Sequence, residues 1–309
     1  MTSPDQSLSI AICTRNRPAS VALTLSHIWR QARHLGTGVE VILVDDGEIE
    51  DATVEAWAMD AVVAGATLRY LRKSPDMRGL YESRKLAVLE ASSEIVLFLD
   101  DDVTIGRNYL SRVLNTFADN PDIAGVGGVD QLSLPAGQGG LGEAFARLFL
   151  MSSGDPGKLS ASGMNYSQAM WRLQADAFAS EFLHGCNMAF RRSALLRLPD
   201  MSWLTGHSPC EDLVLSYEAS RWGKLVVDPN LRVYHLAIEG GRGNMRERLK
   251  ARVGNAARFQ IHRKGRLGLP FIWSACGMLA KDLAKAIKDT RSPFVGIRDV
   301  LFGYAGAIR

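Results

Sequence analysis

The sequence predicts an α/β protein built on a doubly wound, mostly parallel β-sheet. Strand-like apolar runs alternate four times with runs of helical periodicity between residues 8 and 119. The strand-like runs are almost continuously apolar, as expected for parallel strands buried on both faces. Polar clusters follow three of these runs, at residues 13–17, 45–47 and 100–102. Because ligands of such sheets bind beyond the carboxyl ends of the strands, we expect a ligand site there.

Local patterns predict the elements in order. Short apolar or β-branched runs predict strands at residues 8–13, 39–44, 67–71 and 95–99. Apolar residues at helical spacing predict helices at residues 18–32, 51–64, 80–92 and 109–119. After residue 120 the pattern predicts a Gly-rich loop at 127–142 and short amphipathic pieces in 143–180. A strand and helix within 182–196, a helix at 210–223 and a strand at 231–236 follow.

Composition and charge indicate a globular chain with a basic end. Of 309 residues, 47% are hydrophobic and 22% are charged. Residues 242–309 hold 15 Lys and Arg against 4 Asp and Glu, whereas the rest of the chain holds 21 against 29. No signal peptide is recognisable, and the longest apolar run near the end counts 14 residues, where a membrane span needs about 18. We therefore expect a cytoplasmic protein without a spanning helix.

Three consecutive aspartates follow the strand predicted at 95–99. Adjacent like charges repel, and burying an unpaired carboxylate is costly. Asp100 and Asp102 are two residues apart, so their side chains point the same way on an extended chain. Such paired carboxylates suit Mg²⁺ or Mn²⁺, which retains open positions for phosphate oxygens. The motif predicts a metal that neutralises a diphosphate, and a capping or turn cluster is the alternative for the motif taken alone.

Other polar residues near the same edge are candidates for a nucleotide site. Asp45 and Asp46 are positioned to accept hydrogen bonds from a base or a ribose, although Asp46 followed by glycine also suits a simple turn. Three cations near this edge are suited to phosphate charge, with solvated surface as the alternative: Arg15, Arg17 and Arg84.

Two further candidates lie later in the chain. Glu211 and Asp212 begin a predicted helix and offer a general base, although acids are also common in the first turn of a helix. His235 ends a predicted strand and offers a third metal ligand, although a lone histidine at a strand end is more often structural.

Taken in order, these motifs resemble family-2 glycosyltransferases of the GT-A fold, which are inverting and use nucleotide sugars. The resemblance extends over roughly residues 8 to 236. The segments that carry it are SIAICTRNRP, VEVILVDDGE, GLYESRKLAVLEASSEIVLFLDDDV, HGCNMAFRRSAL and CEDLVLSYEASRWGKLVVDPNLRVYH.

The resemblance implies a role for each matching residue of the donor site. Asp46 would contact the nucleotide base, with Thr14 and Arg15 lining the same pocket. Asp100 and Asp102 would be the DxD pair that holds Mn²⁺ or Mg²⁺, with Asp102 closer to the metal.

The remaining roles concern the sugar and the acceptor. Asp101 would face the ribose or the sugar, and Gly185 of the HGCN segment would shape the donor-sugar and acceptor pocket. Asp212, with Glu211 beside it, would be the catalytic base, and His235 matches a histidine that binds the metal in some members.

The resemblance also has departures and implications for organisation. Cys13, Arg15 and Lys85 depart from the family pattern, which weakens the details of the donor pocket. We expect a GT-A catalytic domain at 1–240, with a nucleotide-binding half to about 130 and an acceptor half beyond it, and a basic helical extension at 241–309. The expected reaction transfers a sugar to a hydroxyl of a glycan or lipid-linked acceptor.

The basic extension predicts two amphipathic helices. Apolar stripes fall at Met245, Leu249, Val253 and Ala256, and at Ile272, Cys276, Leu279 and Leu283 with Trp273 beside them. Such helices either lie on an anionic membrane, here the inner face of the cell membrane, or pack on the catalytic domain. No recognition motif supports a nucleic-acid partner.

Three other interpretations of the motifs stay open. DDDVT also resembles the nucleophile motif of haloacid-dehalogenase-type phosphatases, but that motif normally ends the first strand of its domain. A nucleotidylyltransferase would need a Gly-rich loop after the first strand, where CTRNRP has no glycine. A non-catalytic membrane adaptor would leave Asp102, Asp212 and His235 without a role.

Overall fold

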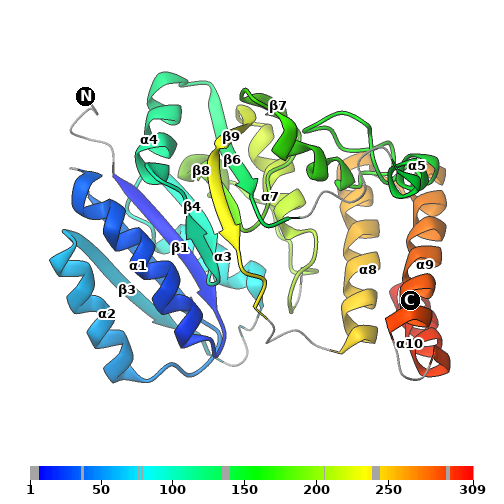
Figure 1. Ribbon diagram of the computed structural model, residues 1–309, viewed down its shortest axis with the longest axis horizontal. Coiled ribbons are helices and arrows are strands. Elements are labelled where there is room, and N and C mark those ends of the chain that lie inside the picture. Colours follow the sequence, from blue (N-terminus) through cyan, green and yellow to red (C-terminus); the bar gives the residue numbers. More distant parts are fainter. Residues whose placement is uncertain are drawn as a thin grey trace.

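A computed structural model describes residues 7–35, 38–74, 77, 79–133, 140–204, 206–238, 244–289 and 293–308. Within this part of the chain, one sheet has helices on both faces, and α8, α9 and α10 stand together at one side of it (Figure 1). The strands are β1 (Leu8–Thr14), β2 (Val39–Asp45), β3 (Ala66–Arg72), β4 (Ile95–Asp100), β5 (Val103–Ile105), β6 (Ile123–Asp130), β7 (Phe178–Ser180), β8 (Asn187–Arg191) and β9 (Lys224–His235).

The sheet is doubly wound and mostly parallel, as predicted. Its spatial order is β3-β2-β1-β4-β8-β6-β9-β5, and β7 pairs with β9. The pairs β3–β2, β2–β1 and β1–β4 are all parallel, and β6 is parallel to β9. β8 is antiparallel to both β4 and β6, so β6 runs in the same direction as β4. The short strands β5 and β7 are antiparallel to β9.

Helices cover both faces of this sheet. They are α1 (Pro18–Leu35), α2 (Asp51–Val63), α3 (Leu80–Glu90), α4 (Tyr109–Asp119), α5 (Leu141–Leu148), α6 (Arg192–Leu195), α7 (Glu211–Ser220), α8 (Met245–Lys264), α9 (Leu269–Asp289) and α10 (Pro293–Ile308), with a 3₁₀ helix η2 (Tyr166–Leu173). One apolar layer joins the sheet to α1, α2 and α4, and a second joins its other face to α3 and α7.

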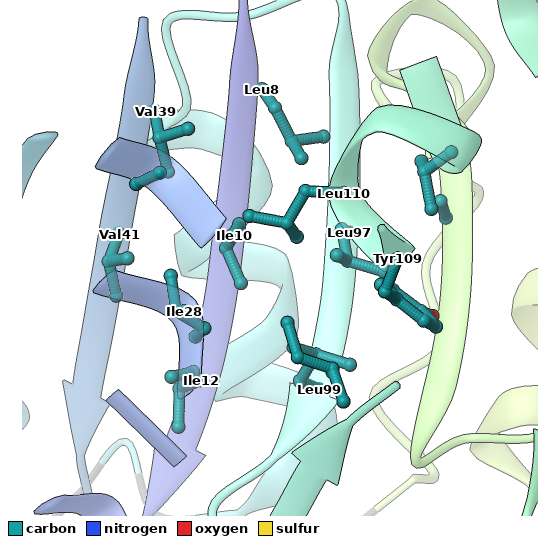
Figure 2. Close-up of a cluster of buried hydrophobic side chains, with 14 of the residues drawn as sticks. Leu8, Ile10, Ile12, Ile28, Val39, Val41, Leu97, Leu99, Tyr109 and Leu110 are labelled. Carbon is teal, nitrogen blue, oxygen red and sulfur yellow. The ribbon is translucent and has the colours of Figure 1, made fainter. Parts of the chain in front are cut away.

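The alternation of side chains along β1 builds the first layer. Leu8, Ile10 and Ile12 are fully buried in the same layer, where they meet Ile28 of α1 and Leu110 of α4 (Figure 2). Burying each such side chain stabilises the fold by about 1.5–3 kcal/mol. This packed centre holds the strands, and therefore the groups at their ends, in fixed positions.

The parallel register brings the carboxyl ends of three strands to one edge. Cys13 of β1 pairs with Val44 of β2 on one side and with Asp100 of β4 on the other, and Thr14 pairs with Asp45. The polar clusters that follow these strands therefore lie at one edge of the sheet.

The beginning of one predicted loop belongs to the core, and residues 134–139 of that loop lie outside the described part of the chain. β6 is fully buried, so the loop predicted at 127–142 is wrong over its first four residues. A Cβ on Gly125 would lie 2.7 Å from the Phe190 ring, and one on Gly128 would lie 1.8 Å from the Leu231 carbonyl oxygen. The glycines are therefore needed because β6 lies unusually close to its neighbours, and they do not mark a turn.

The apolar stripes predicted on α8 and α9 differ in how far they are buried. On α8 the predicted stripe packs inward, with Leu249 and Val253 buried, and Asn255 Nδ2 donates to the Pro209 carbonyl oxygen at 3.0 Å. On α9 the predicted stripe is divided, because Ile272 is 49% exposed whereas Leu279 and Leu283 pack against the apolar cluster of the C-terminal helices. Among the described residues, none of the helices combines the length and the apolar character needed to cross a bilayer.

Candidate functional site

Three predicted metal ligands converge at the edge of the sheet. β5 pairs with β9 so that Val103 lies opposite His235, which brings the end of β9 back to the aspartates after β4. One ligand atom each from Asp100, Asp102 and His235 lies within 4.8 Å of the others. His235 Nε2 lies 3.1 Å from Asp102 Oδ1 and 3.7 Å from Asp100 Oδ2. Two carboxylates and an imidazole form a donor set that fits Mn²⁺ or Mg²⁺.

Charge and hydrogen bonds maintain Asp102 as a carboxylate. Burial opposes its ionisation, but the hydrogen bond and charge of His235 and the charge of Arg17 outweigh it and lower the pKa of Asp102 to about 2. The backbone N–H of Ile238 also donates to Asp102 Oδ2 at 3.0 Å. The hydrogen bond to Asp102 raises the pKa of His235. Asp102 is therefore a carboxylate at neutral pH and can attract a cation.

Asp101 points to the other side of the strand end. Thr14 Oγ1 donates to Asp101 Oδ2 at 2.7 Å, and Arg17 Nη1 lies 3.1 Å from Asp101 Oδ1. Burial raises the pKa of Asp101 to about 6, against the pull of Thr14 and Arg17. Arg17 also donates to Asp102, so one guanidinium spans two of the three aspartates.

Arg84 of α3 connects the aspartates to the beginning of α7. It is buried and pairs with Glu211, and its Nη2 donates to Asp100 Oδ1 at 3.1 Å and to the Gly185 carbonyl oxygen at 2.7 Å. The guanidinium also lies 5.4 Å from the centre of the Phe98 ring. Burial alone would lower the pKa of Arg84, but Glu211 and Asp100 raise it above its ordinary value, so Arg84 stays charged.

The two acids of α7 have different surroundings. Glu211 is 4% exposed, faces Arg84, and burial raises its pKa to about 7 against the pull of that guanidinium. Asp212 is only partly buried, and its Oδ2 accepts from the Gly185 N–H at 3.3 Å. A Cβ on Gly185 would lie 3.3 Å from both Arg84 Nη1 and Glu211 Oε1, so a larger residue would crowd this junction. Asp212 is therefore the acid of the pair that is open to a ligand.

The two aspartates at the carboxyl end of β2 that were predicted to contact the nucleotide, Asp45 and Asp46, have different surroundings. Asp45 is fully buried and accepts hydrogen bonds from the backbone of Gly47 and Ile49 and from Tyr70, so its carboxylate shapes the turn after β2. Asp46 accepts from the Gly79 N–H at 3.2 Å.

Two cations, Lys73 and Arg15, lie at the same edge of the sheet. Lys73, which the sequence did not indicate, lies with its Nζ 3.3 Å from Asp46 Oδ1 and has a fully buried side chain. It directly follows β3, the parallel neighbour of β2, and that position is the signal that finds it. Arg15 is exposed at the same edge.

A cavity of about 320 Å³ lies beside the cluster of Asp100, Asp102 and His235 and reaches α9. Asp130 at the end of β6 lines it, and Asp130 Oδ1 accepts from the His235 backbone N–H at 3.0 Å. His184, next to Gly185, lines it as well. Asp130 was missed at the sequence level because it ends a strand whose last four residues were predicted as a loop.

Comparison with solved structures identifies the fold. The mannosyltransferase PcManGT from Pyrobaculum calidifontis, in complex with GDP-Man and Mn²⁺, is 17% identical, with a TM-score of 0.56 over 100% of this chain and 88% of that chain. S. aureus TarS 1-349 in complex with UDP-GlcNAc is 13% identical, with a TM-score of 0.59 over 98% of this chain and 82% of that chain.

A third solved structure matches over a smaller share of its own length. GalNAc-T7 with UDP, GalNAc and Mn²⁺ is 16% identical, with a TM-score of 0.57 over 82% of this chain and 47% of that chain. The chain therefore spans about half of that protein. At these identities the likeness concerns the fold, and it confirms the GT-A architecture that the sequence motifs implied.

Comparison with curated proteins finds no matching relative. A family model described as Glycosyl transferase family 2 matches residues 9–198, which include the aspartates after β4 and the HGCN segment. Because this match covers more than half of the chain, the protein is a glycosyltransferase and belongs to glycosyl transferase family 2.

Proposed function

We propose that this glycosyltransferase moves a sugar from a nucleoside-diphosphate sugar to an acceptor hydroxyl in one displacement that inverts the anomeric centre. The observation that carries the proposal is the bridge made by Arg84, which contacts both Asp100 of the metal cluster and Glu211 beside Asp212. A single buried cation thereby joins the group of residues that binds a diphosphate to the group that holds a base. A displacement needs these two groups on either side of the reacting carbon.

Each residue of the site has a separate role in this reaction. Asp212 is the base that accepts the proton of the acceptor hydroxyl, and the N–H of Gly185 orients its carboxylate. Glu211 acts through Arg84 by holding the guanidinium next to Asp100. Asp100, Asp102 and His235 would hold Mn²⁺ or Mg²⁺, which when bound supplies positive charge to the departing diphosphate.

The donor end of the site is formed by residues after β1, β2 and β3. Asp46, flanked by Lys73, offers a carboxylate to the nucleotide base, and Thr14 and Arg15 line the same end. Asp101 lies toward the ribose or sugar, with Arg17 beside it. The nucleotide-bound neighbours support this donor class, since PcManGT was solved with GDP-Man and Mn²⁺, and TarS with UDP-GlcNAc.

Calorimetry with nucleoside diphosphates tests the proposed function. UDP, GDP, dTDP and CDP are each titrated into the full-length protein with Mn²⁺, and again after addition of EDTA. At least one nucleotide is expected to bind with Mn²⁺ and to lose most of its affinity in EDTA, because its pyrophosphate would face unscreened carboxylates. A lack of chelator-sensitive binding by all four nucleotides would contradict the proposal.

The family match favours glycosyl transfer over the phosphatase and adaptor alternatives. The position of the aspartates agrees, because β4 is the fourth strand in the chain and lies inside the sheet. A phosphatase of the haloacid-dehalogenase type would have Asp100 at the end of its first strand.

We further propose a lipid-linked or glycan acceptor at the inner membrane face, in the synthesis of a polysaccharide. The support is a set of exposed apolar residues on α9, most of them in its first two turns, with lysines along one flank. The apolar members are Leu269, Ile272, Trp273, Cys276 and Ile287, and the basic flank holds Lys281, Lys285 and Lys288. An apolar stripe beside positive charges is the pattern of a helix that lies on an anionic lipid surface.

Flotation with anionic liposomes tests the membrane proposal. The double variant Leu269→Asp with Ile287→Asp is expected to lose at least about tenfold in liposome binding, since each side chain contributes about 1.5–3 kcal/mol when buried in the interface. These residues are 80% and 55% exposed, so the fold should tolerate the change. The matched control is Val62→Asp with Val63→Asp on α2, which are also exposed. Equal binding by the two double variants would contradict a docking face on α9.

A further inference from the structure

The cavity beside Asp130 lies close to the proposed reaction centre. Asp130 lines the cavity and accepts the backbone N–H of His235, which is a member of the metal cluster. His184 lines it too and immediately precedes Gly185, whose N–H donates to Asp212. A molecule in this cavity therefore lies next to both the metal cluster and the proposed base, on the side away from the nucleotide residues after β2 and β3.

The wall formed by η2 suits a polar ring. Asn165 and Gln168 offer amides, and Tyr166 and Trp171 offer aromatic surface. Amides and aromatic faces together match a saccharide.

The charged groups of the cavity favour an anion. Asp130 contributes the negative charge, but its oxygens already accept from the backbone of Leu132 and His235 and from the Ser133 hydroxyl. Lys281 and Arg172 contribute two positive charges. Lys281 Nζ lies 5.0 Å from the centre of the Tyr166 ring, and Arg172 Nη1 donates to the Ser133 carbonyl oxygen at 2.6 Å.

Since an ammonium has three donors and a guanidinium has five, both cations retain donors for a ligand. The cavity therefore has a surplus of positive charge and of hydrogen-bond donors. A carboxylate or a phosphate uses both of them, whereas a neutral hydroxyl uses only the donors.

From these contacts we infer that the cavity is the acceptor subsite and that it takes a saccharide bearing an anionic group, a carboxylate or a phosphate, bound by Lys281 and Arg172. The inference rests on the proposed transfer function and names the class of acceptor. The volume of about 320 Å³ is near the lower end of the range for ligand pockets, about 300–1,000 Å³, and suits one sugar unit with its acidic group. Lys281 also belongs to the helix that carries the exposed stripe, so a lipid-linked phosphate would arrive on this side.

Direct binding tests the inference without a known acceptor. Ligand-observed NMR is recorded on the full-length protein with Mg²⁺ and UDP, using matched neutral, 6-uronate and 6-phosphate forms of glucose and galactose. Uronates or sugar phosphates are expected to bind more tightly than the neutral sugars. Lys281→Met and Arg172→Met should each weaken the anionic ligands by about tenfold, as for loss of one charge-assisted hydrogen bond. Lys250→Met, a matched change at an exposed lysine of α8 outside the cavity, should leave them unaffected.

Four outcomes would overturn the inference. The first is neutral sugars binding as tightly as the acidic ones, and the second is equal binding by Lys281→Met and Lys250→Met. The third is binding of neither acidic form. The fourth is binding of inorganic phosphate as tight as that of the sugar phosphates, which would leave no role for the saccharide wall. Nucleotide calorimetry on the same samples separates these results from failure of the proposed function, because neither variant removes a residue of the metal cluster.

Discussion

Asp212→Asn is expected to slow glycosyl transfer by about a hundredfold to ten-thousandfold, the range that a positioned general base contributes. Asparagine has nearly the same shape and still accepts a hydrogen bond from the N–H of Gly185, so the fold should persist. It does not accept the proton of the acceptor hydroxyl. Initial rates of donor consumption and product formation measure the loss.

The same variant should bind nucleotide as the wild type does. Asp212 lies outside the Asp100, Asp102 and His235 cluster, so chelator-sensitive nucleotide binding by calorimetry is the internal control. Asp122→Asn is the matched variant, because this exposed carboxylate lies just before β6, at the opposite end from Asp130. Near-normal turnover by Asp212→Asn would show that another group takes the proton.

Asp102→Asn is expected to abolish metal-dependent nucleotide binding and to lower transfer by at least about a hundredfold. The change removes one of the two carboxylates of the cluster. It also removes the charge that Arg17 and His235 share, which leaves Asp101 beside Arg17 and Asp100 beside His235. Breaking a buried ion pair by removing one partner typically costs about 3–5 kcal/mol, so a lower melting temperature should accompany the loss.

Titration of Mn²⁺ alone distinguishes the metal effect from the loss of stability. Electron paramagnetic resonance of free Mn²⁺ should show binding by the wild-type protein and by Asp122→Asn, and almost none by Asp102→Asn at a temperature where all three are folded. Unchanged Mn²⁺ affinity in folded Asp102→Asn would remove this residue from the ligand set.

The Arg84 bridge explains how the two halves of the site stay aligned. Its guanidinium is 3% exposed and has carboxylates on two sides, Asp100 from β4 and Glu211 from α7. Burying three charged groups is costly unless each is paired with good geometry. Such a group holds its partners in one arrangement, which a reaction that depends on the distance between base and diphosphate requires.

Much of the fold was predictable because its first half follows local rules. The four strands through β4 and the helices between them have unbroken apolar runs and regular helical spacing, and the structure has all of them. The aspartates after β4 were predictable as a metal pair because residues two apart share a face of an extended chain. The family resemblance added the order of motifs that linked them to Asp212 and His235.

Other elements were not predictable because their reasons are not local. β6 is rich in glycine, a residue that weakens isolated strands, and it exists because β8 and β9 pack so closely on it. β5 is three residues long and is defined by its pairing with the end of β9. The first half of β9 and the last helix, α10, were also missed at the sequence level.

Periodicity and chemical type are properties of neighbouring residues, so they were enough to predict the parallel α/β sheet, the carboxylates after β4 and the acids that begin α7. The folded structure was needed to find that Asp45 shapes a turn, that Lys73 pairs with Asp46, that Arg84 joins the metal cluster to α7, and that Asp130 and Lys281 line one cavity. These relations join residues far apart in the chain, and their geometry follows from strand order and helix packing, which no local pattern encodes.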